Sequence, residues 1–162
     1  MDESVLKGML SGRAVIVCIG NELRGDDGVG PFVSGLIKAS RKVTVINCGE
    51  TPENYLGVIS RLNPQKVVII DAANFGGQPG QIRTVSRSEI TGGGLSTHDA
   101  VLTLFSGYIE EQTGAETFFV AIQPGPTEVG GRLSVRVEQA AIRLAGLINQ
   151  VIQEQESDPE LP

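Results

Sequence analysis

The chain has little of what most metal centres and disulfide scaffolds need: one histidine, two cysteines and no tryptophan among 162 residues. A single histidine excludes HExxH zinc proteases and most zinc centres built only from protein ligands. Two cysteines are too few for a disulfide framework. No apolar run approaches the ~20 residues that a membrane-spanning helix needs. Residues 1–4 are acidic where a signal peptide would be basic, so we expect a cytoplasmic protein.

Basic residues are also scarce, because 13 Lys and Arg stand against 19 Asp and Glu, a net charge of −6. That balance argues against nucleic-acid binding. The length indicates a single domain over 1–162, with a core at about 13–152. We expect the leader 1–12 and the polar tail 153–162 to be poorly ordered.

Apolar β-branched runs alternate with helical patterns along this core. The expected strands are 13–19, 43–48, 66–71, 81–86 and 117–122, and the expected helices are 28–40, 52–62, 97–112 and a long C-terminal helix. This alternation predicts an α/β fold with a mostly parallel sheet and helices on both faces. The hairpin-like connection from 71 to 81 indicates that the fourth strand is antiparallel.

Three polar segments follow strands or open a helix, where ligands bind in open α/β sheets. Asp26 and Asp27 precede the helix after the first strand; we expect one to cap that helix and the other to be available for function. Asp71 ends the third strand, either bonding the following turn or acting as a ligand or base. His98 lies in the first turn of its helix, where the dipole favours neutral imidazole. Two carboxylates and one imidazole form an open, weak site for a transition metal.

Other chemistries are less favoured. The glycine-rich loop 20–30 lacks GxGxxG and GK[ST] spacing, and its acids would repel phosphate. Cys18 lies inside a strand, whereas Cys48 leaves a Cys–His mechanism open; Ser96 is expected to cap a helix. A noncatalytic metal-sensing or phospho-accepting α/β domain remains an alternative. However, receiver domains carry a lysine after the fifth strand, and the last lysine here is Lys66.

Six motifs occur in a characteristic order: IGNELRGDDGVG (19–30), CGETPEN (48–54), VVIIDA (67–72), PGQIR (79–83), STH (96–98) and AIQP (121–124). Together they resemble the [NiFe]-hydrogenase maturation endopeptidases of the HycI type, which process group 4, hydrogenase-3-like large subunits. The resemblance implies a three-layer sandwich with a twisted five-stranded sheet. It also implies removal of a C-terminal extension from the large-subunit precursor once nickel is inserted.

The resemblance further assigns roles to individual residues. It places the catalytic, nickel-recognising groups on Asp27, Asp71 and His98, with nickel carried by the substrate. The substrate-binding turn falls on Gly49, Glu50 and Thr51, with Glu50 where many relatives have glycine. Either the metal polarises the scissile carbonyl or a water, or an aspartate activates water. We expect a monomer or weak dimer.

Overall fold

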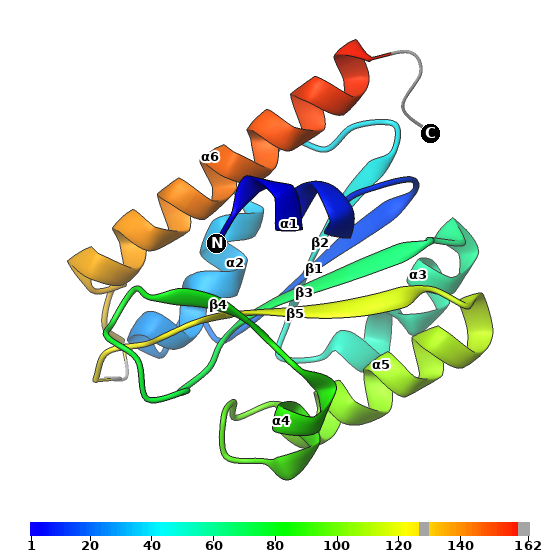
Figure 1. Ribbon diagram of the computed structural model, residues 1–162. Coiled ribbons are helices and arrows are strands. Elements are labelled where there is room, and N and C mark those ends of the chain that lie inside the picture. Colours follow the sequence, from blue (N-terminus) through cyan, green and yellow to red (C-terminus); the bar gives the residue numbers. More distant parts are fainter. Residues whose placement is uncertain (127–129, 159–162) are drawn as a thin grey trace.

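The computed structural model describes residues 1–126 and 130–158, and its centre is a five-stranded sheet (Figure 1). The strands are β1 Ala14–Ile19, β2 Val43–Gly49, β3 Lys66–Ala72, β4 Ile82–Val85 and β5 Glu116–Ile122, in the order β2-β1-β3-β5-β4. Four strands run parallel, and β4 pairs antiparallel with β5. This confirms the predicted α/β fold, including the antiparallel fourth strand.

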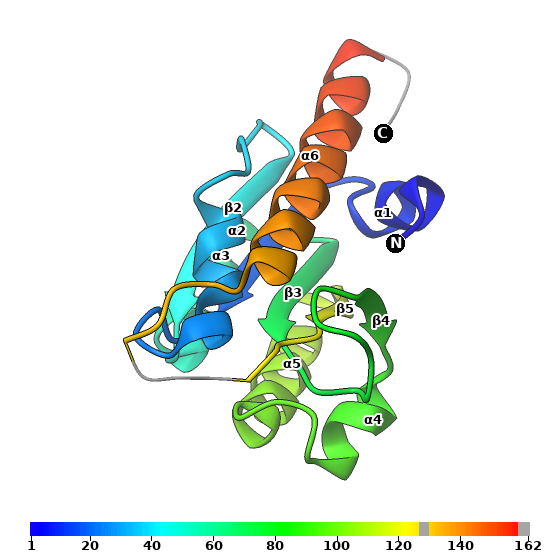
Figure 2. The same ribbon diagram turned by 90° about the vertical axis from the view of Figure 1, so that its left-hand side faces the viewer.

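Helices cover both faces of the sheet and make the three layers (Figures 1 and 2). The helices α1 Glu3–Met9, α2 Val29–Ser34 and α6 Val135–Ser157 lie on one face. The other face carries α3 Leu56–Leu62, α4 Arg87–Gly92 and α5 Asp99–Thr113. Single 3-10 turns, η1 Gly25–Gly28 and η2 Pro52–Tyr55, precede α2 and α3. No described helix is both long and apolar enough for a membrane span.

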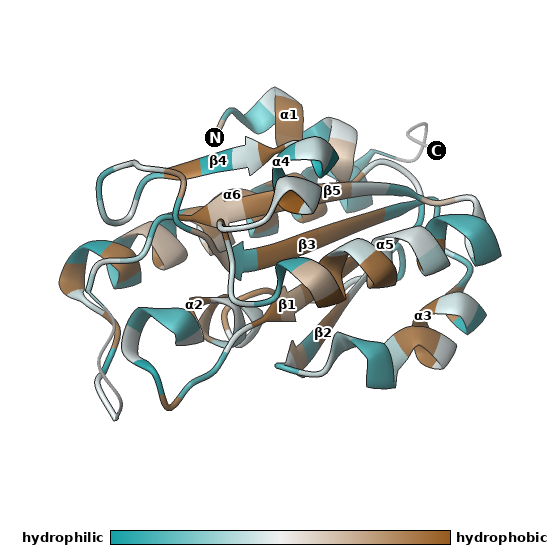
Figure 3. Cartoon of the chain, turned by 90° about the horizontal axis from the view of Figure 1, so that it is seen from below, coloured by the Kyte–Doolittle hydropathy of each residue, from teal (hydrophilic) through white to brown (hydrophobic). Residues whose placement is uncertain are grey.

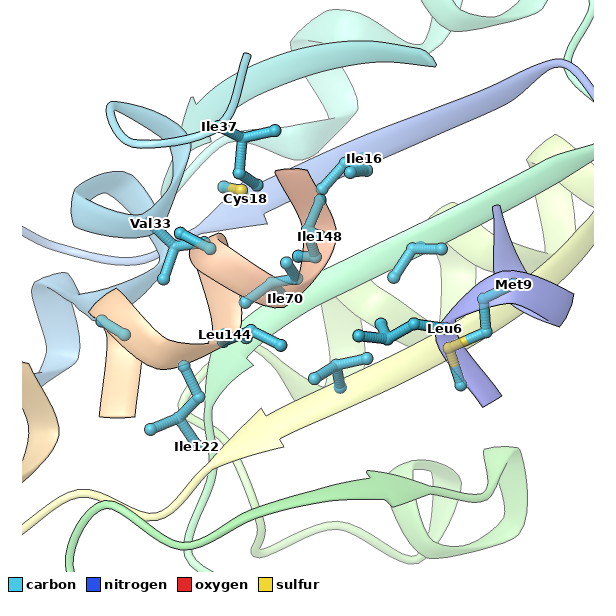
Figure 4. Packing of buried hydrophobic residues seen from close by; sticks show 14 of the residues in the cluster. Leu6, Met9, Ile16, Cys18, Val33, Ile37, Ile70, Ile122, Leu144 and Ile148 are labelled. Atoms are coloured by element: carbon cyan, nitrogen blue, oxygen red, sulfur yellow. The ribbon is translucent and has the colours of Figure 1, made fainter. Parts of the chain in front are cut away.

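The core is divided in two by the sheet because successive strand residues point to opposite faces. In β1, Ile16 and Cys18 pack toward α1, α2 and α6, as Figure 4 shows, whereas Val15 and Val17 pack toward α5. Every residue of β1 is buried. Burial on both faces explains the continuous apolar runs in the sequence, which colour the central strands brown in Figure 3.

The prediction that both ends of the chain are poorly ordered is wrong for the residues that the structure describes there. The expected leader contains α1, where Leu6 and Met9 are buried against the sheet and Asp2 caps the helix by accepting from the Ser4 N–H at 3.0 Å. The expected tail begins inside α6, which continues to Ser157 because its apolar stripe extends to Ile152. Residues 159–162 of the predicted tail lie outside the described residues.

The helix predicted over 28–40 is also shorter than expected, since α2 ends at Ser34. Beyond it, Asn149 of α6 bonds the backbone directly: its Oδ1 accepts from the Lys38 N–H at 2.8 Å, and its Nδ2 donates to the Leu36 carbonyl at 2.9 Å. A residue 111 positions away in the sequence therefore replaces the helical hydrogen bonds. Hydrophobic periodicity reflects only near neighbours, so it could not predict this helix end.

Candidate active site

The glycines of the first loop let it fold tightly onto the end of β1. A Cβ on Gly30 would lie 2.1 Å from the Ile19 carbonyl oxygen, and a Cβ on Gly20 would lie 2.1 Å from the Asp27 carbonyl oxygen. Gly20 also has a φ of +153°. These positions need glycine because backbone approaches backbone, not because a phosphate is cradled. The packing brings Asp26 and Asp27 to the carboxyl edge of the sheet.

Asp26 is a structural anchor. It is buried, and its carboxylate accepts from the Gly125 N–H at 2.8 Å, from the Ser134 N–H at 2.6 Å and from the Ser134 Oγ at 2.8 Å. These bonds hold η1 against the segment between β5 and α6. Neither acid caps the helix that follows, as neither η1 nor α2 has a side-chain cap. The expected capping role was therefore wrong, although one of the two acids is structural.

Asp27 has a different environment. It is 8% exposed, and its Oδ2 atom is buried with no hydrogen-bond partner. Burial raises the pKa of the Asp27 carboxyl, and the nearby His98 and Arg24 oppose that rise. Buried carboxylate oxygens are normally hydrogen-bonded, so an unpaired one at a sheet edge marks a functional candidate.

Asp71 and His98 contact each other directly, Asp71 from the end of β3 and His98 from the residue before α5. Asp71 Oδ2 lies 3.1 Å from His98 Nδ1, while Asp71 Oδ1 is buried without a partner. Asp71 is only 5% exposed, and no bond from its side chain to the following turn is found. The contact uses Nδ1, so the other ring nitrogen, Nε2, is left for a second partner.

Ser96 is the residue of this site whose role the sequence did not reveal. Its Oγ donates to Asp71 Oδ2 and accepts from the His98 N–H at 3.1 Å, so it orients both partners. The predicted capping role is not found, because α5 has no side-chain cap. Asp99 instead fixes the loop before the helix, where its carboxylate accepts from the Leu95 and Ser96 N–H groups at 2.9 Å each. The only sequence feature that could have indicated this role is the position of the serine two residues before the single histidine.

The Asp71 contact also affects the pKa of the imidazole. Its hydrogen bond raises the pKa of His98 above the ordinary value and outweighs burial, which acts in the opposite direction. The helix-dipole argument predicted the reverse and was wrong, because a carboxylate in contact acts more strongly than a helix terminus. Burial raises the pKa of Asp71 as well, and the contacts with His98 and Ser96 oppose that rise.

The turn between β2 and η2 contributes a third carboxylate. The Thr51 N–H donates to the Cys48 carbonyl at 3.1 Å, and Gly49 adopts a φ of +53° inside the turn. Glu50 then projects over the site, with Oε1 3.7 Å from His98 Nε2. Of the three predicted substrate-binding residues, Glu50 is thus the one whose side chain lies beside the histidine.

The two cysteines are poorly suited to nucleophilic chemistry. Cys48 is buried, and burial together with Glu53 raises the pKa of its thiol to about 12. Burial raises the pKa of Cys18 further. Because the thiolate is the nucleophile, neither cysteine is reactive near neutral pH. The Cys–His mechanism left open by the sequence is therefore not supported.

The donor atoms suit a cation, but only as a partial set. Asp27 Oδ2 and Asp71 Oδ1 lack partners, and His98 Nε2 is the type of nitrogen that transition metals prefer. Within 1–126 and 130–158, no three His, Cys, Asp or Glu side chains are already arranged to hold a metal ion. An ion that arrives with ligands of its own fits such an incomplete set better than a free ion does.

Comparison with known proteins identifies the class. A family model described as HycI: Hydrogenase maturation protease matches residues 34–151. The chain is therefore a processing endopeptidase of the kind that matures hydrogenases. It belongs to the HycI hydrogenase maturation protease family. The matched region includes Asp71 and His98, whereas Asp27 lies just before it.

Individual relatives agree with this assignment. The Hydrogenase 3 maturation protease of Escherichia coli K12 is 35% identical over 113 residues, covering 68% of this chain and 72% of that protein. The crystal structure of HycI from Thermococcus kodakarensis KOD1 superposes with a TM-score of 0.83 at 38% identity, covering 92% and 99% of the two chains. The solution structure of E. coli HycI gives a TM-score of 0.75 at 25% identity, covering 85% and 90%.

Proposed function

We propose that this protease removes a C-terminal extension from the large-subunit precursor of a group 4, hydrogenase-3-like [NiFe]-hydrogenase after nickel insertion. Asp27, Asp71 and His98 would recognise the nickel that the precursor carries. The family membership supports the substrate class, and the relative named as a Hydrogenase 3 maturation protease supports the type. The observation that carries the metal proposal is the pair of buried, unpartnered carboxylate oxygens beside one imidazole.

Burying carboxylate oxygens without partners costs free energy, so the arrangement is expected where a ligand later supplies the missing partner. We expect a cationic ligand, because the unpartnered oxygens belong to two acids that both interact with His98. Asp71 and Ser96 would fix the ring so that Nε2 points toward the half-exposed Glu50, as a carboxylate orients a metal-binding histidine. Recognition would then place the scissile peptide near the acids.

The incomplete donor set accounts for cleavage only after nickel insertion. Because the protein supplies too few ligands of its own, it would bind an ion already held by the precursor's ligands more tightly than a free ion. A precursor that lacks nickel would leave the carboxylates unpaired and would dock weakly. The metal thus serves as part of the substrate, and the protein's residues supply its recognition.

The test is cleavage of purified precursor, with and without nickel, followed by mass spectrometry of its C-terminus. We expect cleavage only of the nickel-loaded precursor, and a loss of at least about 100-fold for Asp27→Asn, Asp71→Asn and His98→Gln. Glu22→Gln is the matched control, since Glu22 is an exposed acid of the same loop. Normal cleavage by one of the three variants would remove that residue from the site. Cleavage of nickel-free precursor would instead indicate conventional aspartic-protease chemistry.

A further inference from the structure

Glu50 also lies beside His98, and the roles proposed for Asp27, Asp71 and His98 do not account for this fourth residue. Its side chain is half exposed, yet it is held in place: Asn21 Nδ2 donates to Glu50 Oε2 at 3.1 Å. The Asn21 amide is itself fixed, because its Oδ1 accepts from the Leu23 N–H at 2.9 Å. This bond joins the first loop to the β2 turn across 29 residues of sequence.

The backbone beneath Glu50 is equally constrained. The register of β2 shifts by one residue against β1, so that Ile19 pairs with Gly49, and the Gly20 N–H donates to the Gly49 carbonyl at 2.9 Å. This irregularity and the left-handed Gly49 turn the chain toward the carboxyl end of β1. The first loop and the β2 turn are therefore joined both through backbone and through the Asn21–Glu50 bond.

The distance between the Glu50 carboxylate and the His98 ring can be compared with the spacing of two donors around one metal ion. Glu50 Oε1 and His98 Nε2 are 3.7 Å apart, which is too long for a hydrogen bond. Donors bind a transition metal at about 2.0–2.2 Å, so two donors of one ion lie roughly 3–3.6 Å apart. The observed spacing is close to that range. The unpartnered, nine-tenths-buried oxygens of Asp27 and Asp71 belong to the same electrostatic cluster, since Asp27 interacts with both His98 and Glu50.

We infer that Glu50 is a further cation-binding carboxylate of this site, which shares an ion with His98 Nε2, and that Asn21 is its positioning residue. This inference rests on the proposed function. It adds a donor at the solvent side, so the ion would contact the buried acids on one side and the half-exposed Glu50 on the other. The same carboxylate would help to distinguish a metal-loaded precursor from an empty one.

The single histidine makes a direct test feasible. In protein labelled with ¹⁵N, the His98 ring signals are unambiguous, and Zn²⁺ serves as a diamagnetic probe. We expect Zn²⁺ to shift Nε2 rather than Nδ1. Glu50→Gln should require at least about tenfold more Zn²⁺ for the same shift, and Asn21→Ala should have a smaller effect in the same direction. Glu53→Gln is the control, because this exposed acid lies on the adjacent 3-10 turn and has no bond to His98.

Equal zinc affinity of wild type and Glu50→Gln would overturn the inference, as would no Nε2 shift in the wild type. A Glu50→Gln variant that lowers only the pKa of His98 would likewise reduce Glu50 to an ion-pair partner. Cleavage of nickel-loaded precursor is measured in parallel. Failure of the wild type to cleave it, with the zinc results as expected, would contradict the proposed function and leave Glu50 as a metal ligand.

Discussion

The adjacent acids Asp26 and Asp27 should respond in opposite ways to one and the same substitution. Asp26→Asn replaces one acceptor oxygen by an NH₂ group that faces the N–H of Ser134 or Gly125, and it removes the charge from the bonds that remain. Bonds to a charged group contribute about 1.5–3 kcal/mol each, and one unpaired buried donor costs about 1–3 kcal/mol. These effects overlap, so we expect a loss of about 2–4 kcal/mol in the free energy of unfolding.

Asp27→Asn should not destabilise the fold. Its Oδ2 has no partner to lose, and burial disfavours its charge, so a neutral amide relieves the desolvation penalty. The free energy of unfolding should equal or exceed that of the wild type. Under the proposed function, the same variant should fold normally and fail to process the precursor.

Urea unfolding at neutral pH, followed by circular dichroism, measures both variants. With a slope of about 2 kcal/mol/M, Asp26→Asn should lower the midpoint by roughly 1–2 M, whereas Asp27→Asn should leave it unchanged or raise it. Equal losses in the two variants, or a larger loss for Asp27→Asn, would refute the division of roles between structural and functional acid.

Two further predictions concern the histidine and the glycine-rich loop. The ¹⁵N resonances of His98 should titrate with a pKa above the ordinary 6.5, so the imidazolium persists at a pH where a free histidine is neutral. In Asp71→Asn that pKa should fall, because the hydrogen bond that raises it most is lost, and an unchanged value would contradict the contact. Gly30→Ala should lower the free energy of unfolding by more than about 2 kcal/mol, since its Cβ would clash with the Ile19 carbonyl. Gly146→Ala in α6 is the control: its Cβ has open space, so the same urea assay should show stabilisation by up to about 1 kcal/mol.

Local patterns were enough to predict the layers of the molecule. Continuous β-branched runs identified the buried strands, and the stripe that includes Val137, Leu144 and Ile148 identified the long helix, because burial acts on neighbouring residues with fixed periods. The ends were less predictable. Leu6 and Met9 gave too short a pattern to indicate a packed helix, and Asn149 ended α2 from far along the chain.

For the site, the sequence by itself determined which segments reach the carboxyl edge of the sheet: the loop with Asp26 and Asp27, the end of β3, and the start of α5. Only the tertiary structure decided what each side chain does there. Asp26 finds its donors 99 and 108 residues away, and Ser96 and Glu50 converge on His98 from separate turns. Strand and helix periods depend on near neighbours, whereas hydrogen-bond partners and burial of charge depend on groups brought together by folding.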